Sequence, residues 1–549
     1  MGEFYKSSMV KNKKILVFIL VLAALLRFIN LSSGDPLGDE MLYAFRAVGP
    51  MDFDVANKQS TPWEWLAPSG VEGFGSTRVP FWARLSWHDH PPLVFWIQHI
   101  FIKLFGENNF AFRFPSTLLG VLSVWLIYLI GRRLFYEKAG LISAFLMAVT
   151  VNNVFISRVG LQESYVIFFI LLTLFLFLKS LENSRYLILM GMAVGLGGLT
   201  KYTTFIVVPI IFTYLLIYKR SYFKDINLWL GVLVGLIIFS PVIIYNISLY
   251  RSVGHFDFQL SYILNQHPKE WLEAPGKEEI GSLDDRVKDF IPNLVKSNSY
   301  VLLMLFAISI FWIKSKNRFL FIWLVFQVSL FLLIGPTRRF LTMLTPTMVL
   351  TAGNFISKFN YKYILVPVII FELFYSLNSH VINFPWGREV LAYSPVRQEN
   401  YNWGYNELEK FFSEELKNKY PKYVFDSRYK FIETFQSASV EQAKEKGDSN
   451  YNALIVYDES IYETAQLWIL DRRQIYHGWP VIKSMDYLTL PEKNVFKNNY
   501  LIIPTVELPL RSGALTASPV LEKDLLKQGI SPIIIKNNKG IDIFKIYLW

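Results

Sequence analysis

Long runs of apolar residues fill residues 1–378, whereas residues 379–549 contain no run of comparable length. An α-helix needs roughly 20 apolar residues to cross the hydrocarbon core of a bilayer. We therefore predict an α-helical polytopic membrane protein with about eleven transmembrane helices, since helices satisfy their own backbone hydrogen bonds in lipid. The predicted spans are residues 13–33, 114–134, 139–157, 162–180, 185–200, 203–219, 227–249, 298–314, 318–335, 341–357 and 362–378.

The composition of the 549-residue chain supports this class of protein. The chain is 52% hydrophobic and only 18% charged, whereas typical soluble domains have about 25% charged residues. It contains no cysteine. This excludes a disulfide scaffold, thiolate catalysis and metal sites built from cysteine ligands.

The formal net charge of +11 raises the question of a nucleic-acid partner. If the N-terminus is cytoplasmic, every second connection between spans carries lysine or arginine, as the positive-inside rule requires. Much of the positive charge therefore serves membrane topology, and we predict no nucleic-acid partner. The protein is expected to be a multi-pass protein of the cell membrane, with a cytoplasmic N-terminus and an extracytoplasmic C-terminal part.

This topology divides the chain into a transmembrane domain, residues 1–378, and an extracytoplasmic domain, residues 379–549. Within the first domain, two large connections are predicted to lie outside the cell. They are residues 34–113, with juxtamembrane helices, and residues 250–297. Outer loops held by rigid helices are common places for function.

The extracytoplasmic domain has the pattern of a soluble α/β fold. Short β-branched or aromatic runs occur at 422–426, 452–458 and 499–505, and two more lie near the C-terminus. Helix-like stretches separate these runs. Alternation of strands and helices predicts a small α/β sandwich.

Several cations break the positive-inside rule. Arg158, Lys201, Arg338 and Arg339 lie in short connections at the predicted outer ends of spans. Cations held at one membrane face by separate helices fit a shared anion such as a phosphate group. The alternative is that each one reaches lipid headgroups or pairs with a nearby acid such as Glu163.

The first outer connection supplies acidic and imidazole side chains. Asp39 and Glu40 follow the first span, and His88, Asp89 and His90 precede a Pro-Pro pair that suits the first turn of a helix. A carboxylate beside a phosphate site suits general-base catalysis. Asp39 is alternatively a helix N-cap. We predict no cofactor, and a divalent metal on His88, His90 and Asp89 stays open as an alternative.

Five segments carry a resemblance to a known family. They are GDEMLYA at 38–44, the stretch from HDHPP to GRRLF at 88–135, SRVGLQESYVIFF at 157–169, GLGGLTKYTTF at 195–205 and TRRFLTMLTP at 337–346. In order and spacing the chain resembles the polytopic glycosyltransferases of the dolichyl-phosphate-mannose–protein mannosyltransferase and aminoarabinose transferase superfamily, which have the GT-C fold. The stretch at 88–135 is the most specific of these segments.

The resemblance implies transfer of a sugar from a polyprenyl-phosphate carrier to an acceptor outside the cell. Asp39 matches an acidic residue thought to act as base, and Lys201 matches a lysine that contacts the carrier phosphate. Asp89 and His90 stand where the aminoarabinose transferases have Glu-Lys, so the charge of the second position depends on pH here. Phe340 stands where a tyrosine is common.

The sequence thus predicts a membrane glycosyltransferase, inverting because one base suffices for direct displacement. The predicted catalytic residues are Asp39 and Glu40, and His88 and Asp89 are predicted to shape the acceptor site. The predicted donor-phosphate ligands are Lys201, Arg338, Arg339, Arg158, His90 and Arg251. The predicted partners are a polyprenyl-phosphate-linked sugar, membrane lipid and an acceptor glycan, lipid or protein. The alternatives are a transporter or flippase for a lipid-linked anionic glycan, and a non-catalytic assembly protein.

Overall fold

The chain forms two compact units in the computed structural model, and each is described by itself. Unit 1 comprises residues 1–33, 89–265 and 275–399, and unit 2 comprises residues 34–88, 266–274 and 400–549. The structure describes residues 2–36, 38–49, 51–53, 61–66, 79–266, 268–269, 281–311, 317–359, 362–382, 384–397, 402–427, 429–505 and 514–549.

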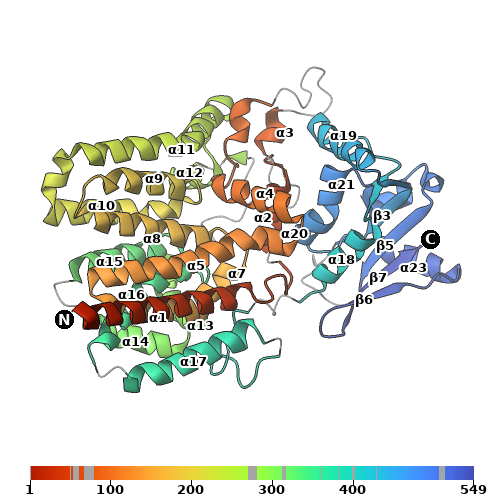
Figure 1. The fold of residues 1–549 in the computed structure, drawn as a ribbon. Coiled ribbons are helices and arrows are strands. Elements are labelled where there is room, and N and C mark those ends of the chain that lie inside the picture. Colours follow the sequence, from red (N-terminus) through yellow and green to blue (C-terminus); the bar gives the residue numbers. More distant parts are fainter. Residues whose placement is uncertain are drawn as a thin grey trace. The chain divides into compact units, whose positions relative to one another are not determined.

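Unit 1 is helical, and its long helices run side by side (Figure 1). Its α-helices are α1 (Gly2–Phe28), α4 (Leu93–Phe105), α5 (Asn109–Leu134), α6 (Glu137–Val149), α7 (Val151–Arg158), α8 (Glu163–Ser180), α9 (Tyr186–Gly198), α10 (Val207–Tyr218), α11 (Ile226–Val253), α12 (Phe258–Ile263), α13 (Leu283–Ser297), α14 (Tyr300–Ile310), α15 (Arg318–Ile334), α16 (Thr345–Ser357) and α17 (Lys362–His380). Its 3-10 turns are η3 (Tyr202–Ile206), η4 (Arg220–Lys224) and η8 (Phe340–Leu344).

Among the described residues, five helices are long and apolar enough to cross a membrane, or six if the bent pair α6 and α7 is one span. Five shorter apolar helices accompany them. Each predicted span coincides with one of these helices, with the bent pair or with α1. The total of about eleven crossings stays a prediction.

Small residues let α9 and α11 pack closely. A Cβ atom on Gly191 would lie 1.9 Å from the carbonyl oxygen of Gly231, and one on Gly235 would lie 2.8 Å from the carbonyl oxygen of Gly191. Gly191 and Gly195 on α9 face Gly231 and Gly235 on α11, with four-residue spacing on both helices. This is the small-residue packing that membrane helices use, because lipid provides no hydrophobic drive for helix association.

The span predicted at 139–157 is not continuous. It breaks between α6 and α7 with a bend of 58°. Thr150 at the break has an extended backbone, and its hydroxyl donates a hydrogen bond to the Leu146 carbonyl at 2.5 Å. A β-branched residue whose hydroxyl bonds the preceding turn favours such a bend.

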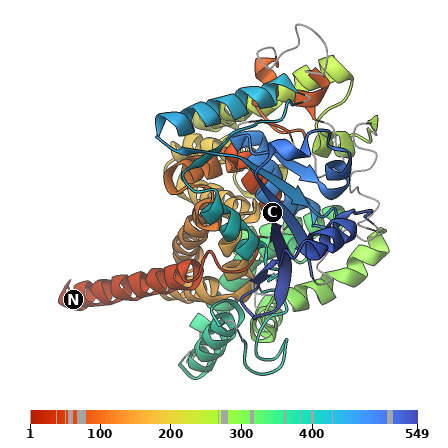
Figure 2. The ribbon, with the colours of Figure 1, turned by 90° about the vertical axis from the view of Figure 1, so that its right-hand side faces the viewer.

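Unit 2 contains a five-stranded mixed sheet in the order β4-β3-β5-β7-β6, visible in Figure 2. β3, β4 and β5 are parallel, and β7 runs antiparallel to both β5 and β6. A separate parallel pair joins β1 to β2. The strands are β1 (Lys419–Pro421), β2 (Ser449–Tyr451), β3 (Ala453–Tyr457), β4 (Val481–Lys483), β5 (Asn498–Pro504), β6 (Ile533–Lys536) and β7 (Asp542–Leu548).

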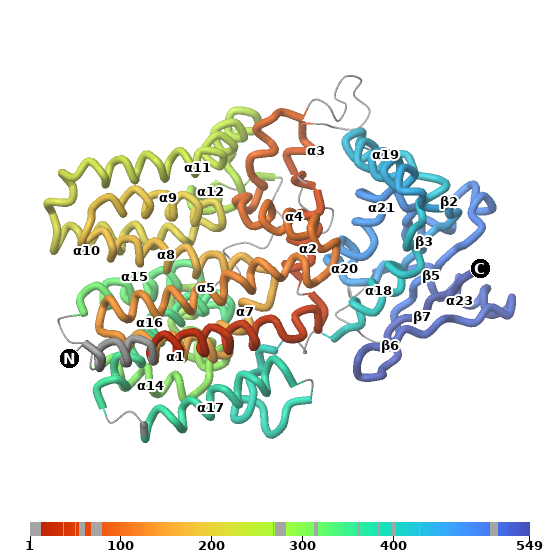
Figure 3. Tube along the Cα trace, in the orientation of Figure 1, coloured from red at the N-terminus to blue at the C-terminus, as the bar shows by residue number. Residues whose placement is uncertain are grey.

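Unit 2 also contains helical segments, some of which lie beside the strands, as the tube in Figure 3 traces. The helical segments are α2 (Gly38–Val48), α3 (Pro62–Leu66), η2 (Phe81–Arg84), α18 (Tyr405–Glu415), α19 (Lys430–Glu445), α20 (Glu463–Gln466), the π-helical turn η10 (Leu467–Asp471), α21 (Arg472–His477), α22 (Ser484–Thr489), η11 (Lys493–Val495) and α23 (Ser518–Lys527). Leu454, Val456, Leu501 and Tyr547 form the centre of one hydrophobic core of this sheet.

The mixed sheet confirms the predicted α/β character of the C-terminal part. The run at 452–458 contains β3, the run at 499–505 contains all of β5 except its first residue, and the two C-terminal runs contain β6 and β7. The strand predicted at 422–426 is wrong, because the strand ends at Pro421 and the following residues are irregular. Proline lacks the N–H that would continue a strand ladder.

Two carboxylates fix α18 within unit 2. Asp35 accepts hydrogen bonds from the backbone N–H groups of Trp403, Gly404 and Asn406 at 2.5, 2.9 and 2.7 Å. Glu409, in the middle of α18, forms ion pairs with Arg472 and Arg473 on α21. The first carboxylate satisfies donors that every helix start leaves without a partner, and it joins residues 34–36 to the C-terminal part.

Candidate functional site

The side chains of Lys201 and Arg339, from separate elements of unit 1, meet at Glu163, the first residue of α8. Its Oε1 atom lies 3.0 Å from Nζ of Lys201 and 3.2 Å from Nε of Arg339. Glu163 and Lys201 are buried, whereas Arg339 is partly exposed. The structure thus brings together two cations that the sequence analysis assigned to one anion.

The cluster carries more positive than negative charge, since two cations share one carboxylate. Lys201 and Arg339 also lie over the ring of Phe340, at 4.6 and 5.4 Å from its centroid. A cation held against an aromatic face keeps its charge while losing part of its hydration. Phe340, where the family commonly has tyrosine, therefore contributes its ring face to the cluster.

Hydrogen bonds fix the loop that carries Lys201 between α9 and η3. The N–H of Leu93, at the start of α4, donates to the carbonyl of Leu199 at 2.9 Å. The hydroxyl of Tyr202 donates to the carboxylate of Asp257. Lys201 therefore lies between two anchors, one on α4 and one on the segment that precedes α12.

Asp257 is the centre of a buried polar network. Its carboxylate accepts from Asn246 Nδ2 at 2.8 Å and from the Leu260 N–H at 2.9 Å, as the N-cap of α12. Its own N–H donates to Asn246 Oδ1 at 2.8 Å. Burial raises the pKa of Asp257, while the hydrogen bonds it accepts oppose that shift.

Asp89 and His90 also belong to unit 1, and they are linked to the segment around Asp257. Nδ1 of His90 lies 3.0 Å from Oδ1 of Asp89. Gln259, on α12, donates to the Asp89 carbonyl at 2.7 Å. The two predicted site residues are thus connected, through α12, to the Asp257 network beside Lys201.

Asp257, Asn246 and Gln259 were not predicted as site residues from the sequence. Asp257 carried one usable signal, because an aspartate before an apolar helical stretch is a common N-cap. Asn246 and Gln259 carried none, since neither residue type nor spacing marks them. Glu163 was named only as an acid able to pair with nearby cations, and the structure shows it pairing with Lys201 and Arg339.

Arg158 takes a different position. Its guanidinium donates to the carbonyls of Leu26, Ile29 and Asn30 at 3.0, 2.7 and 3.0 Å. These carbonyls lie at the end of α1, where a helix leaves acceptors without intrahelical donors. Arg27 satisfies a carbonyl at the end of α6 in the same way, because its guanidinium donates to the carbonyl of Ala148 at 2.8 Å.

The remaining predicted phosphate ligands of unit 1 are more exposed. Arg338 is exposed beside Arg339, and its backbone carbonyl accepts a hydrogen bond from the hydroxyl of Ser297 at 3.4 Å. Arg251 lies exposed in the last turn of α11. Their roles stay predictions.

Asp39, Glu40 and His88 belong to unit 2. Asp39 is exposed and Glu40 is buried in the first turn of α2. Because α2 begins at Gly38, Asp39 lies inside the helix and not at its N-cap. The ring of buried His88 lies 2.8 Å from Oδ1 of Asp52, and its backbone N–H donates to Oδ2 at 2.7 Å. Their predicted catalytic and site-shaping roles stay predictions.

The alternative metal site has no support in the geometry. Within the residues that the structure describes, no group of three or more His, Asp or Glu side chains is arranged to hold a metal ion. His88 pairs with Asp52, and His90 pairs with Asp89.

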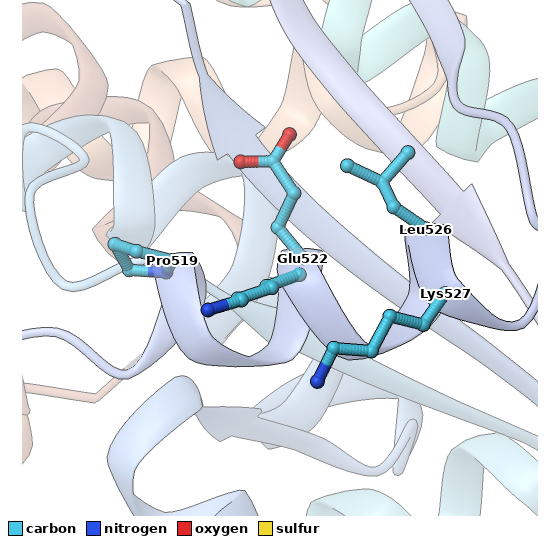
Figure 4. Close-up of a pocket in the computed structure, with 5 residues that line it drawn as sticks. Pro519, Glu522, Leu526 and Lys527 are labelled. Carbon is cyan, nitrogen blue, oxygen red and sulfur yellow. The ribbon is translucent and has the colours of Figure 1, made fainter.

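A hollow on unit 2 is not a candidate active site. It lies over α23 and is lined by Pro519, Glu522, Leu526 and Lys527, which Figure 4 labels, and by Lys523. All five residues come from one helix. Glu522 accepts hydrogen bonds from Lys545 and Tyr547 at 2.8 and 2.7 Å, so its carboxylate is engaged in holding α23 to β7.

Residues 89–245 match the protein family described as dolichyl-phosphate-mannose-protein mannosyltransferase. This segment of the chain is similar to that family. The matched segment contains Asp89, His90, Glu163 and Lys201. The resemblance predicted from the sequence motifs is thereby confirmed.

Curated relatives match over similar segments. A putative mannosyltransferase, YkcB of Bacillus subtilis, is 30% identical over 166 residues, covering 29% of this chain and 23% of the relative. An undecaprenyl phosphate-alpha-4-amino-4-deoxy-L-arabinose arabinosyl transferase of Wigglesworthia glossinidia brevipalpis is 27% identical over 158 residues, covering 27% of this chain and 28% of the relative. The chain thus matches about a quarter of the length of these relatives.

The fold matches over the whole chain. The crystal structure of ArnT from Cupriavidus metallidurans, bound to undecaprenyl phosphate, aligns with a TM-score of 0.54 at 11% identity, covering 99% of this chain and 98% of that one. The chain is therefore a multi-pass membrane protein with an ArnT-like fold, and the predicted fold class is confirmed to that extent.

Proposed function

We propose that the protein is a membrane glycosyltransferase that moves a sugar from a polyprenyl-phosphate carrier to an acceptor hydroxyl on the extracytoplasmic face. The observation that carries the proposal is the Glu163–Lys201–Arg339 cluster, in which two cations from separate elements share one buried carboxylate. The family match over 89–245 and the ArnT-like fold support it.

Direct displacement at the anomeric carbon inverts its configuration. The bond between the acceptor oxygen and the anomeric carbon forms as the bond from that carbon to the phosphate oxygen breaks. The acceptor proton passes to a carboxylate, for which we propose Asp39. The leaving group is the polyprenyl phosphate, and cations that meet its developing charge lower the barrier.

Lys201 and Arg339 are the proposed ligands of that phosphate. Arginine offers forked donors and lysine a compact charge, which together suit a tetrahedral oxyanion. Glu163 holds both cations in place before the carrier binds. The carrier phosphate and Glu163 then share the two cations. Asp257 fixes the lysine loop through Tyr202.

Arg158 is left out of the proposed phosphate site, since its guanidinium serves the end of α1. His90 and Asp89 stay in the proposal as groups near the carrier phosphate. The proposal does not name a particular sugar or acceptor, because the side chains of the site recognise only the carrier phosphate.

The test uses the purified full chain with a panel of undecaprenyl-phosphate-linked sugars, and it measures released undecaprenyl phosphate by mass spectrometry. Detergent micelles have no second compartment, so release of undecaprenyl phosphate in micelles supports a transferase. If no donor and acceptor gave any release, the transferase proposal would be contradicted and a transporter would be favoured. Lys201→Ala should weaken donor binding at least about tenfold, because a charged hydrogen bond to phosphate contributes about 1.5–3 kcal/mol.

Lys179→Ala is the matched control, since Lys179 lies at the opposite end of α8, against the ring of Tyr186. It should leave donor binding unchanged. Asp39→Asn should keep donor binding and lose transfer by about 100-fold or more. Transfer at the wild-type rate would remove Asp39 from the mechanism.

A further inference from the structure

Unit 1 has a cavity with charged and apolar lining near the opposite end of α8 from Glu163. Its volume is about 720 Å³, and its walls come from the ends of α5, α8 and α10 and the start of α15. The 18 residues of α8, at about 1.5 Å per residue, separate its two ends by about 27 Å. This is close to the hydrocarbon thickness of a bilayer. With α8 as a transmembrane helix, the cavity would lie at headgroup depth on the membrane face opposite to Glu163.

Tyr214 and Phe319 are two of the aromatic residues that line this cavity, and both pack against Phe177, which is not among the lining residues. The rings of Tyr214 and Phe319 have centroids 5.4 Å apart, and both lie 5.6 Å from that of Phe177. Leucines at the ends of three helices complete the apolar lining: Leu134, Leu178, Leu181 and Leu320. An aromatic and aliphatic wall at this depth suits the glycerol and upper acyl region of a lipid.

Two arginines from separate helices provide the charge. Arg318, the exposed first residue of α15, lies 5.0 Å from the ring centroid of Tyr218. Arg133, near the end of α5, donates through Nε to the Leu178 carbonyl at 3.0 Å and pairs with Glu182. Glu182 is 70% exposed at the rim, so the charged lining has two cations and one solvated acid.

We propose that this cavity binds the phosphate headgroup of an anionic phospholipid from the surrounding leaflet, with Arg133 and Arg318 as its ligands. The excess positive charge selects an anion, and the apolar wall selects one that carries acyl chains. Basic pockets between membrane helices bind such headgroups. With the predicted orientation this face is cytoplasmic, where the positive-inside rule also places basic residues. The site does not depend on the proposed transfer reaction.

The experiment titrates the purified full chain in neutral detergent with dioctanoyl phosphatidylglycerol, dioctanoyl phosphatidylcholine or inorganic phosphate. Native mass spectrometry counts bound lipid, and the thermal unfolding midpoint gives an independent measure of binding. The wild-type protein should prefer phosphatidylglycerol over phosphatidylcholine at least about tenfold. Equal binding of the two lipids would overturn the proposal, and so would an equal stabilisation by inorganic phosphate alone, which would indicate a site for free anions.

Three variants sharpen the test. Arg318→Gln should lose most of the preference, and because Arg318 is exposed it should leave the fold intact. Glu182→Gln should increase affinity, since it releases Arg133 from its competing carboxylate. Arg220→Gln, at an exposed arginine on the same face outside the cavity, should bind as wild type. An unchanged preference in Arg318→Gln, or weaker binding in Glu182→Gln, would refute the assignment.

Discussion

Replacing Glu163 by glutamine tests the central cluster most directly. The substitution keeps the size of the side chain and removes its charge. Lys201 and Arg339 would then lie near one another without the carboxylate that lies 3.0 and 3.2 Å from them. The net charge of the cluster would rise from one positive charge to two. We expect opposite effects on stability and on phosphate binding.

The magnitude follows from the distances. At an effective dielectric constant of about 20, each ion pair at about 3 Å is worth roughly 5 kcal/mol before desolvation is counted. Burial of the carboxylate offsets part of that attraction, and breaking a buried pair typically costs about 3–5 kcal/mol. We expect Glu163→Gln to lower the free energy of unfolding by that amount. Binding of a phosphate would restore more stability to Glu163→Gln than it adds to the wild type, because in the variant the phosphate does not compete with a carboxylate for the two cations.

The assay measures unfolding of the full chain in detergent, with and without undecaprenyl phosphate, for the wild type, Glu163→Gln and Lys201→Ala. Glu163→Gln should be less stable alone, yet bind undecaprenyl phosphate at least about tenfold more tightly, whereas Lys201→Ala should bind it more weakly. Glu182→Gln, at the solvent-exposed acid just beyond the other end of α8, should leave the stability nearly unchanged. If Glu163→Gln bound undecaprenyl phosphate as weakly as Lys201→Ala, the reasoning would be refuted.

Three further outcomes follow from the structure. Burial raises the pKa of Glu409, but its two arginine partners lower it more, so the pKa lies below its usual value. The contribution of Glu409 to stability should therefore be complete above about pH 4.3 and should disappear as the pH falls through the lower folded-state pKa. Acid titrations followed by tryptophan fluorescence should show this contribution in the wild type and its absence at all pH values in Glu409→Gln. Gly191→Val should disrupt the α9–α11 contact and lower the thermal midpoint strongly, whereas Gly254→Ala, with open space around its Cβ but a left-handed backbone, should cost only about 1 kcal/mol. Asp257→Asn should weaken binding of undecaprenyl phosphate several-fold by loosening the lysine loop. Asp225→Asn, which alters the partly exposed N-cap at the other end of α11, should leave that binding unchanged. Equal effects of both substitutions would argue against a positioning role for Asp257.

The membrane part of the fold was predictable because its signal is local. A run of apolar residues identifies a helix without any knowledge of its neighbours. The break at Thr150 was not predictable in this way, since threonine is common inside helices and its bend depends on the packing around it. The joining of residues 34–88 to the C-terminal part was hidden for the same reason. Asp35 looks like an ordinary loop residue until the start of α18 lies against it.

The site shows the limit of the argument from charge. Arg158 and Lys201 gave the same signal in the sequence, a cation in a short connection on the predicted outer face. The structure separates them by their partners, because Arg158 donates to backbone carbonyls at the end of α1 and Lys201 meets a carboxylate. A cation that donates to neutral carbonyls keeps the end of a helix in place, as Arg158 does. Lys201 instead shares a carboxylate with the partly exposed Arg339, and these are the two cations proposed to accept a phosphate. The partners and the exposure of each cation, which no sequence pattern gives, therefore distinguish a helix anchor from a proposed phosphate ligand.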